Sequence, residues 1–542
     1  MKFTIGLILN LLLTVTCFAG STDAMKYLPV QDGGRIKPYD TFSREALQLI
    51  TGRQTFQGRP AVEIVTTWFL TPQAWDDKKI IEISHKGLKE SLRLDVNEKY
   101  FASQDLVRND RIGLLFQELA NKVETKEKLD PYYQAVARLR NQIDLFMGIR
   151  EGAAVRVAPQ AGSEAANNQW VPLNKLDDNQ RIKFSEISKA FVTALPNDVP
   201  GQSSQADQLK VAVDDFIKSS RESNPAAYAD SKAIELEVHY NSFQPFQKTW
   251  IFYLLAALSL AFAWQSGRRQ WYQAGWVFAL IAFALHLYGF GLRIYLTGRP
   301  PVSNMYESVI WVSFGVVLFS IIFEAIQRKR FILLAGTSVA VLCLIVANSA
   351  PAILDRSLQP LEPVLRSNLW LTIHVLTITI SYSAFFLAFA LGDLALFYFL
   401  KGENERSEKV RSIVQSIYRA MQVGVVLLAA GTILGGVWAD YSWGRFWGWD
   451  PKETWAFIAL MGYLAVLHGR LVGLVREFGM AASAVITFSL VLMAWYGVNF
   501  VLGAGLHSYG FGAGGVEYVS GFVFLHLVFV GYVAFVRKQR AA

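Results

Sequence analysis

The sequence predicts a mainly α-helical protein: a polytopic membrane helix bundle of about nine spans, preceded by an extracytoplasmic soluble domain of α+β or mainly α type. Three observations predict this class. Of the 542 residues, 52% are hydrophobic and only 18% are charged. Long apolar segments recur through the second half of the chain. The net charge of +8 also lies in that half, because residues 1–249 hold 31 basic and 31 acidic side chains whereas residues 250–542 hold 21 and 13.

Residues 1–24 are predicted to be a signal peptide or a retained N-terminal anchor. A basic start at Lys2 precedes an apolar stretch that is shorter than the ~20 residues a spanning helix needs. Residues 25–245 have the composition of a soluble domain. Apolar residues at helical spacing predict helices over 130–150 and 205–221, and an alternating pattern predicts a strand over 79–84.

Residues 246–542 are predicted to form the membrane domain. Most of their apolar segments are long enough to cross a hydrocarbon layer of about 30 Å at a helical rise of about 1.5 Å per residue. The predicted spans are 250–264, 272–297, 308–326, 331–350, 369–400, 412–437, 455–473, 480–501 and 518–536.

Basic residues are concentrated in every second loop between these segments and at the C-terminus. Loops enriched in lysine and arginine lie on the cytoplasmic side of a membrane. Nine spans then place residues 25–245 and the loop 438–455 outside, in agreement with a secretory leader. The pattern predicts a multi-pass protein in the lipid of a bacterial inner (cytoplasmic) membrane, and it explains the positive charge without nucleic acid as a partner.

The outward loop 438–455 contains five tryptophans interleaved with glycine, aspartate and proline. Aromatic residues enrich any membrane interface, and such a belt accounts for one or two of them. Five in one loop favour a broad apolar surface that could bind a large planar ligand.

Five of the seven histidines lie in or near predicted spans, where an imidazole is costly unless it is paired or bound. They are His286, His374, His468, His507 and His526. The topology places His374 and His507 at the level of the tryptophan loop. Two neutral imidazoles beside an aromatic surface are typical of bis-histidine ligation of haem iron. For either histidine alone, a hydrogen bond to a neighbouring helix is an equal explanation.

Four motifs, in this order along the chain, resemble those of the cytochrome c assembly proteins. They are Arg299–Ser308, Leu369–Val375, Trp443–Asp450 and Gly505–Tyr509. The resemblance is greatest to the CcsA/ResC-like haem-handling component of the system II (Ccs) cytochrome c synthase. Residues 28–38 also resemble the external segment that precedes this membrane unit in fused synthases.

The resemblance implies a function in cytochrome c biogenesis. Haem b would be carried to the outer face of the membrane and presented for covalent thioether attachment to the CxxCH site of apocytochrome c, as in a haem lyase. His374 and His507 would bind the iron of the external haem, and His468 would bind a second haem near the cytoplasmic face. The residues around the external macrocycle would be Trp443, Trp447, Trp449 and Asp450.

The resemblance also implies two partner proteins, because the chain lacks features that the attachment of haem requires. In fused synthases a ResB-like membrane half supplies the ligand opposite the inner histidine, and this chain has no corresponding spans. Either a separate ResB-like subunit supplies it, which we favour, or His286 does. The chain also lacks the cysteines to reduce its client, so a thiol-reducing protein is expected.

External cations are expected to pair with the haem propionates, with Arg445 of the tryptophan loop as the first candidate. The others are Arg293, Arg299, Arg356, Arg366 and Lys452. The alternative function, from another class, is a respiratory membrane subunit that binds b-type haem or quinone. It predicts paired histidines buried within facing spans.

Overall fold

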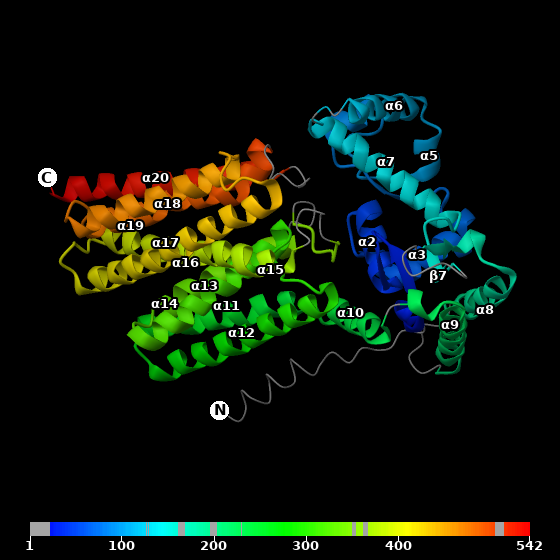
Figure 1. Ribbon diagram of the computed structural model, residues 1–542, viewed down its shortest axis with the longest axis horizontal. Helices are drawn as coiled ribbons and strands as arrows, with labels where there is room; N and C mark the ends of the chain where they lie inside the picture. The colour runs from blue at the N-terminus through cyan, green and yellow to red at the C-terminus, as the bar shows by residue number, and fades with distance from the viewer. Residues whose placement is uncertain are drawn as a thin grey trace. The chain divides into compact units, whose positions relative to one another are not determined.

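The computed structural model describes residues 22–125, 127, 129–160, 169–195, 203–228, 230–349, 354–360, 367–503 and 514–541 (Figure 1). The chain divides into two compact units, residues 1–243 and 244–542. Both are mainly helical, and among the described residues strands occur only in the first unit.

The first unit contains a four-stranded antiparallel sheet of order β2-β1-β7-β8, and two further strand pairs, β3-β4 and β5-β6. Its strands are β1 (Pro29–Asp32), β2 (Arg35–Pro38), β3 (Thr55–Phe56), β4 (Arg59–Pro60), β5 (Lys79–Glu82), β6 (Tyr100–Ala102), β7 (Arg156–Pro159) and β8 (Trp170–Pro172). Between β1 and β2, Gly33 and Gly34 have φ angles of 58° and 79°. A two-residue hairpin needs this left-handed backbone, which glycine adopts without strain.

Helices surround these strands. The α-helices are α2 (Tyr39–Thr51), α3 (Ala61–Leu70), α4 (Lys86–Ser91), α5 (Ser103–Val107), α6 (Asp110–Glu124), α7 (Pro131–Arg150), α8 (Asp178–Ala194), α9 (Ser203–Ser223) and α10 (Ser231–Phe243), and the 3₁₀ helices are η1 (Asp23–Tyr27), η2 (Pro72–Trp75), η4 (Leu173–Lys175) and η5 (Pro225–Ala227). Helix α7 confirms the prediction over 130–150. The carboxylate of Asp130 accepts a hydrogen bond of 2.8 Å from the amide of Tyr133, with Pro131 in the first turn. Helix α9 and strand β5 confirm the other two predicted elements.

The second unit is a helix bundle. Among the described residues, nine helical segments are long and apolar enough to cross a membrane, which confirms the predicted number of spans. They are α11 (Pro245–Ser266), α12 (Arg269–Thr297), α13 (Met305–Gln327), α14 (Ile332–Ser349), α15 (Asn368–Trp370) continued by η7 (Leu371–Val375) and α16 (Leu376–Leu400), α17 (Glu408–Trp443), α18 (Pro451–Leu471), α19 (Glu477–Leu492) continued by η8 (Met493–Leu502), and α20 (Val516–Ala541). The first of these begins at Pro245 rather than at residue 250.

Helix α16 is the centre of the bundle and packs against α13, α17 and α19. Glycines allow these helices to approach closely, as is common in membrane bundles. A Cβ atom at Gly424 of α17 would lie 2.5 Å from the Phe385 ring of α16, and one at Gly392 of α16 would lie 2.9 Å from the carbonyl oxygen of Ala481 in α19. Helices α12 and α18 lie on opposite sides of this bundle (Figure 1).

Two of the spans contain π-helical turns, η7 before α16 and η8 after α19. A π-helical turn widens the helix and re-aims its side chains, and it occurs frequently at functional sites. Both turns line the same cavity.

Candidate functional site

His374 lies on the π-helix η7 and is half-buried. Its Nδ1 atom is 2.8 Å from the carbonyl oxygen of Gly431 on α17. A carbonyl can only accept a hydrogen bond, so Nδ1 carries the proton of the neutral ring and Nε2 carries the lone pair. This is the tautomer in which a histidine binds a metal ion through Nε2.

Two glycines of α17 create the space for this imidazole. A Cβ atom at Gly435 would lie 2.6 Å from Cε1 of His374, and one at Gly431 would lie 2.8 Å from the Cα atom of Ile378. Helix α17 therefore approaches η7 and α16 at a distance that only glycine permits, and the imidazole is clamped between the helices.

His374 lines a cavity within the second unit that is partly open to solvent. Pockets for ligands and cofactors typically have mainly apolar walls. The walls of this one are provided by η7, α16, α17, η8 and the starts of α13 and α18. The lining residues include Val302, Ser303, Met305, Ser308, Leu371, Val375, Ile378, Tyr382, Trp438, Trp447, Lys452, Glu453, Ala456, Trp495 and Asn499.

The predicted tryptophans are distributed between this cavity and the loop surface. Trp447 lines the cavity, and its ring meets the Trp449 ring edge-on at a centroid distance of 5.9 Å. Trp449 itself is 69% exposed and has a left-handed φ of 57°. Trp443 lies beneath the Arg445 guanidinium, 5.7 Å from its ring centroid. The structure thus brings Trp447 to the cavity of His374 and leaves Trp443 and Trp449 outside its lining.

Two further tryptophans belong to the cavity and were not among the predicted site residues. The Trp438 ring lies 5.8 Å from the His374 ring, and the Trp370 ring stacks on the Trp438 ring at a centroid distance of 6.4 Å. Trp495 lies on η8, and its Nε1 atom donates a hydrogen bond of 2.9 Å to the Ser308 hydroxyl. Trp438 lies in the predicted loop and could have been included, whereas the sequence gives no sign that Trp495 of the eighth span reaches this site.

Asp450 forms the N-cap of α18. Its buried carboxylate accepts a hydrogen bond of 2.9 Å from the amide of Lys452, while the Glu453 carboxylate accepts from the amides of Gly448 and Asp450 at 2.8 and 3.2 Å. This is a capping box with one further hydrogen bond, from the amide of Gly448 in the loop. It fixes the loop segment that carries Trp447.

Arg445 belongs to the same network. Its Nη1 atom lies 3.4 Å from the Glu453 carboxylate, and a Cβ atom at Gly448 would lie 1.6 Å from it. The guanidinium therefore passes directly over Gly448, where a side chain would have to displace it. The cation expected to bind a propionate is held by a carboxylate of its own chain.

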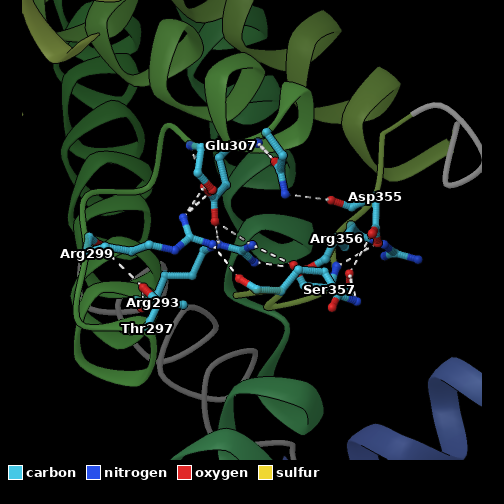
Figure 2. Close-up of polar contacts among 10 residues, drawn as sticks. Arg293, Thr297, Arg299, Glu307, Asp355, Arg356 and Ser357 are labelled. Atoms are coloured by element: carbon cyan, nitrogen blue, oxygen red, sulfur yellow. Dashed lines mark hydrogen bonds and ion pairs between the residues drawn. The ribbon is translucent and has the colours of Figure 1, made fainter. Parts of the chain in front are cut away.

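A buried charge cluster lies at the start of α13 (Figure 2). Arg293 of α12 donates to Glu307 of α13 at 2.8 and 3.0 Å, and Arg299 donates to the same carboxylate at 3.0 Å. Glu307 also accepts from the amide and hydroxyl of Ser303 at 2.8 and 2.7 Å. The cluster fixes the segment 302–308, which lines the cavity, and it engages two of the cations expected to bind propionates.

The same two arginines hold the loop 354–360. Arg293 donates to the carbonyl oxygens of Arg356 and Ser357 at 3.0 and 3.2 Å, and Arg299 donates to that of Gln359 at 2.9 Å. Figure 2 shows this loop segment beside the cluster. Arg366, another expected propionate partner, lies outside the described residues.

The two histidines considered for an inner site do not come together. His468 is exposed on α18, with Nδ1 2.7 Å from the Leu464 carbonyl oxygen, so its Nε2 atom also carries the lone pair. His286 of α12 is fully buried, and the Phe246, Phe290 and Phe314 rings lie 5.0–5.6 Å away. Since α12 and α18 lie on opposite sides of the bundle, His286 is not positioned to share a ligand with His468 (Figure 1).

The remaining two histidines of the second unit are His507 and His526. His507, the second predicted external ligand, lies outside the described residues. His526 of α20 bonds within the bundle: Nε2 lies 3.3 Å from the Asp393 carboxylate of α16, and Nδ1 lies 2.7 Å from the Phe522 carbonyl oxygen. This agrees with a role for His526 in helix packing.

The fold and the cavity define a class: a multi-pass membrane protein with a tautomer-fixed histidine in an aromatic cavity. Residues 302–507 match the family described as cytochrome C assembly protein. The cytochrome c biogenesis protein CcsA of Synechococcus sp. (strain CC9605) is 33% identical over 291 residues, which are 47% of this chain and 93% of that protein. The chain belongs to the cytochrome c assembly protein family, and its function lies in cytochrome c biogenesis.

A longer relative matches both units. Protein NrfI of Wolinella succinogenes is 28% identical over 498 residues, which are 88% of this chain but 53% of that protein. The chain therefore spans about half the length of this relative. Among solved structures, the cytochrome c haem lyase CcmF matches with 15% identity and a TM-score of 0.38, over 54% of this chain and 50% of that one.

Proposed function

We propose that this protein carries haem b to the outer face of the bacterial inner membrane and presents it there for covalent attachment to apocytochrome c. The observation that carries the proposal is the His374 imidazole, fixed by the Gly431 carbonyl and facing a cavity with walls of tryptophan and aliphatic side chains. A neutral imidazole supplies an axial ligand to iron, and aromatic walls suit the faces of a macrocycle. His507 is the proposed second ligand.

The proposed reaction depends on positioning. Each client thiol adds across a haem vinyl group: the sulfur forms a bond to one vinyl carbon, the thiol hydrogen passes to the other, and no electrons are gained or lost overall. Holding the iron at His374 and the ring against Trp447 and Trp438 keeps a vinyl edge in one place while the thiols approach, which lowers the entropic part of the barrier. The client's own histidine then replaces a protein ligand and releases the haem.

A second haem is proposed to load near the cytoplasmic face at His468. An exposed imidazole on a membrane-spanning helix is costly in lipid, so a partner is expected to cover it. We propose a separate ResB-like membrane subunit as this partner, contributing the opposite iron ligand. In this scheme residues 25–245 and the tryptophan loop face the periplasm, and a thiol-reducing protein keeps the CxxCH site of the client reduced.

The proposal is tested by the visible spectrum of the full-length protein, purified after co-expression with a ResB-like subunit. Two low-spin haem signals are expected. Substituting His374→Gly should abolish or shift the external signal, and free imidazole should restore it, because a small ligand can occupy the space left by the side chain. His85→Ala, in the first unit, is the control and should leave both signals unchanged. A spectrum that survives both His374→Gly and His507→Gly would refute the external site.

The inner site is tested separately. His468→Ala should lower the haem content of the complex. When His468→Ala is combined with His374→Gly, free imidazole should still restore the external haem signal. If the chain alone, without any ResB-like subunit, attached haem to apocytochrome c, the partner in this proposal would be wrong.

A further inference from the structure

Lys452 is the only lysine or arginine among the described residues that line the His374 cavity. It follows Pro451 in the first turn of α18, whose N-terminus therefore opens onto this cavity. The positive end of the helix dipole and the ammonium group both favour an anion here, and the Glu453 carboxylate that lines the same cavity pairs with Arg445. His374 lines the same cavity.

Three of the other cations that were expected to bind propionates are engaged by carboxylates of the chain. Arg445 pairs with Glu453, and Arg293 and Arg299 share Glu307. No carboxylate of the described residues lies within 4 Å of the Lys452 ammonium group. The two acids nearest to it in the sequence serve the helix cap: Asp450 accepts a hydrogen bond from the backbone amide of Lys452, and Glu453 accepts from the amides of Gly448 and Asp450.

A half-buried ammonium group in a mainly apolar cavity is incompletely solvated, and a carboxylate would relieve this cost. A haem bound through His374 brings two such carboxylates, its propionates. We propose that Lys452 is the propionate-binding residue of this cavity and forms an ion pair with a carboxylate of the bound macrocycle. This inference rests on the proposed function, and it assigns to Lys452 the role first expected of Arg445.

The consequence is a fixed orientation of the ring. One contact at the iron leaves the macrocycle free to rotate about the axis through His374, and a second contact at its edge removes that freedom. Propionates and vinyl groups lie on opposite edges of haem b. Lys452 therefore determines that the vinyl edge faces away from the start of α18, and it acts as a positioning residue for the attachment reaction.

The test uses equilibrium binding of iron mesoporphyrin, whose ethyl groups cannot react with thiols, and of its dimethyl ester, which lacks the carboxylates. The wild-type protein should bind the free acid about 10- to 100-fold more tightly than the ester, as is usual for a hydrogen bond to a charged group. Lys452→Met should bind the two with nearly equal affinity, and Lys452→Arg should restore the preference. Lys538→Met, an exposed lysine near the C-terminus, is the control and should behave as wild type.

The outcomes separate this inference from the proposed function. If neither compound gives a His374-dependent spectrum with the wild-type protein, the haem site itself is wrong. If both bind through His374 but folded Lys452→Met keeps the wild-type preference for the free acid, only the assignment to Lys452 is overturned. The elution profile and melting temperature of each variant establish that it is folded.

Discussion

The Nδ1 atom of His374 lies 2.8 Å from the carbonyl oxygen of Gly431, and Gly435, one turn later on α17, leaves the space for the same ring. One face of α17 therefore determines the tautomer of His374 and also leaves the space that its imidazole occupies. The two effects belong together, because a side chain at Gly435 would displace the imidazole from the carbonyl that determines its proton position.

Gly435→Ala is expected to weaken haem binding at least about tenfold, because ligand geometry at a metal depends on its outer-shell hydrogen bond. A Cβ atom there would lie 2.6 Å from Cε1 of His374, so the ring must move. Titration with haem, followed by absorbance, measures the effect. Gly291→Ala is the matched control, because a Cβ atom there meets nothing within 4 Å. Equal affinities for the two variants would contradict the clamp.

Glu453→Ala is expected to loosen the tryptophan loop. The substitution removes the acceptor for the amides of Gly448 and Asp450 and the partner of Arg445, and loss of a cap of this kind costs about 0.5–2 kcal/mol. Proteolysis within 443–450 should become faster, and haem affinity should fall because Trp447 is no longer held. Glu408→Gln, at an exposed position in the first turn of α17, should change neither rate nor affinity.

The sequence predicted the features that depend on local composition, such as the spans and single helices. It predicted fewer of the contacts that depend on how the helices pack. Hydropathy located the spans, and the Asp130-Pro131 start located α7, because both signals are local. The cavity is not local: Trp495 of η8 and Ser308 of α13 meet through a hydrogen bond between residues 187 positions apart. No motif records that contact.

The identity of the cation that binds a propionate also depends on packing, and the sequence alone did not determine it. Arg445 and Lys452 both lie in or beside the tryptophan motif, and the sequence favoured the arginine within it. The backbone, which takes a left-handed φ at Trp449, brings the Arg445 side chain to Glu453 and Lys452 to the cavity lining. Which of two neighbouring cations is engaged by its own chain depends on this backbone path.

Glu307→Ala is expected to destabilise the second unit strongly. Arg293 is fully buried and Arg299 is 4% exposed, so removing their shared carboxylate leaves two buried cations uncompensated. Breaking a buried pair in this way costs about 3–5 kcal/mol. Thermal unfolding in detergent measures the loss. Glu403→Ala removes an exposed pair with Lys409 at 3.8 Å, for which about 0–1 kcal/mol is expected. Similar melting temperatures for both variants would show that the cluster is not needed for stability.

His286→Phe is expected to be tolerated. Three phenylalanine rings surround the imidazole, its Nδ1 lies 3.4 Å from the Tyr253 hydroxyl, and its Nε2 is buried without a hydrogen bond to any described residue. Replacing a poorly bonded polar group by an apolar one of similar shape is nearly neutral or stabilising.

The melting temperature of His286→Phe should therefore stay close to that of the wild type, and both haem signals should remain. His468→Ala, measured alongside, should lose the inner signal. If folded His286→Phe lost that signal as well, His286 would be an iron ligand, and the bundle would have to bring α12 and α18 together in a state that differs from this structure.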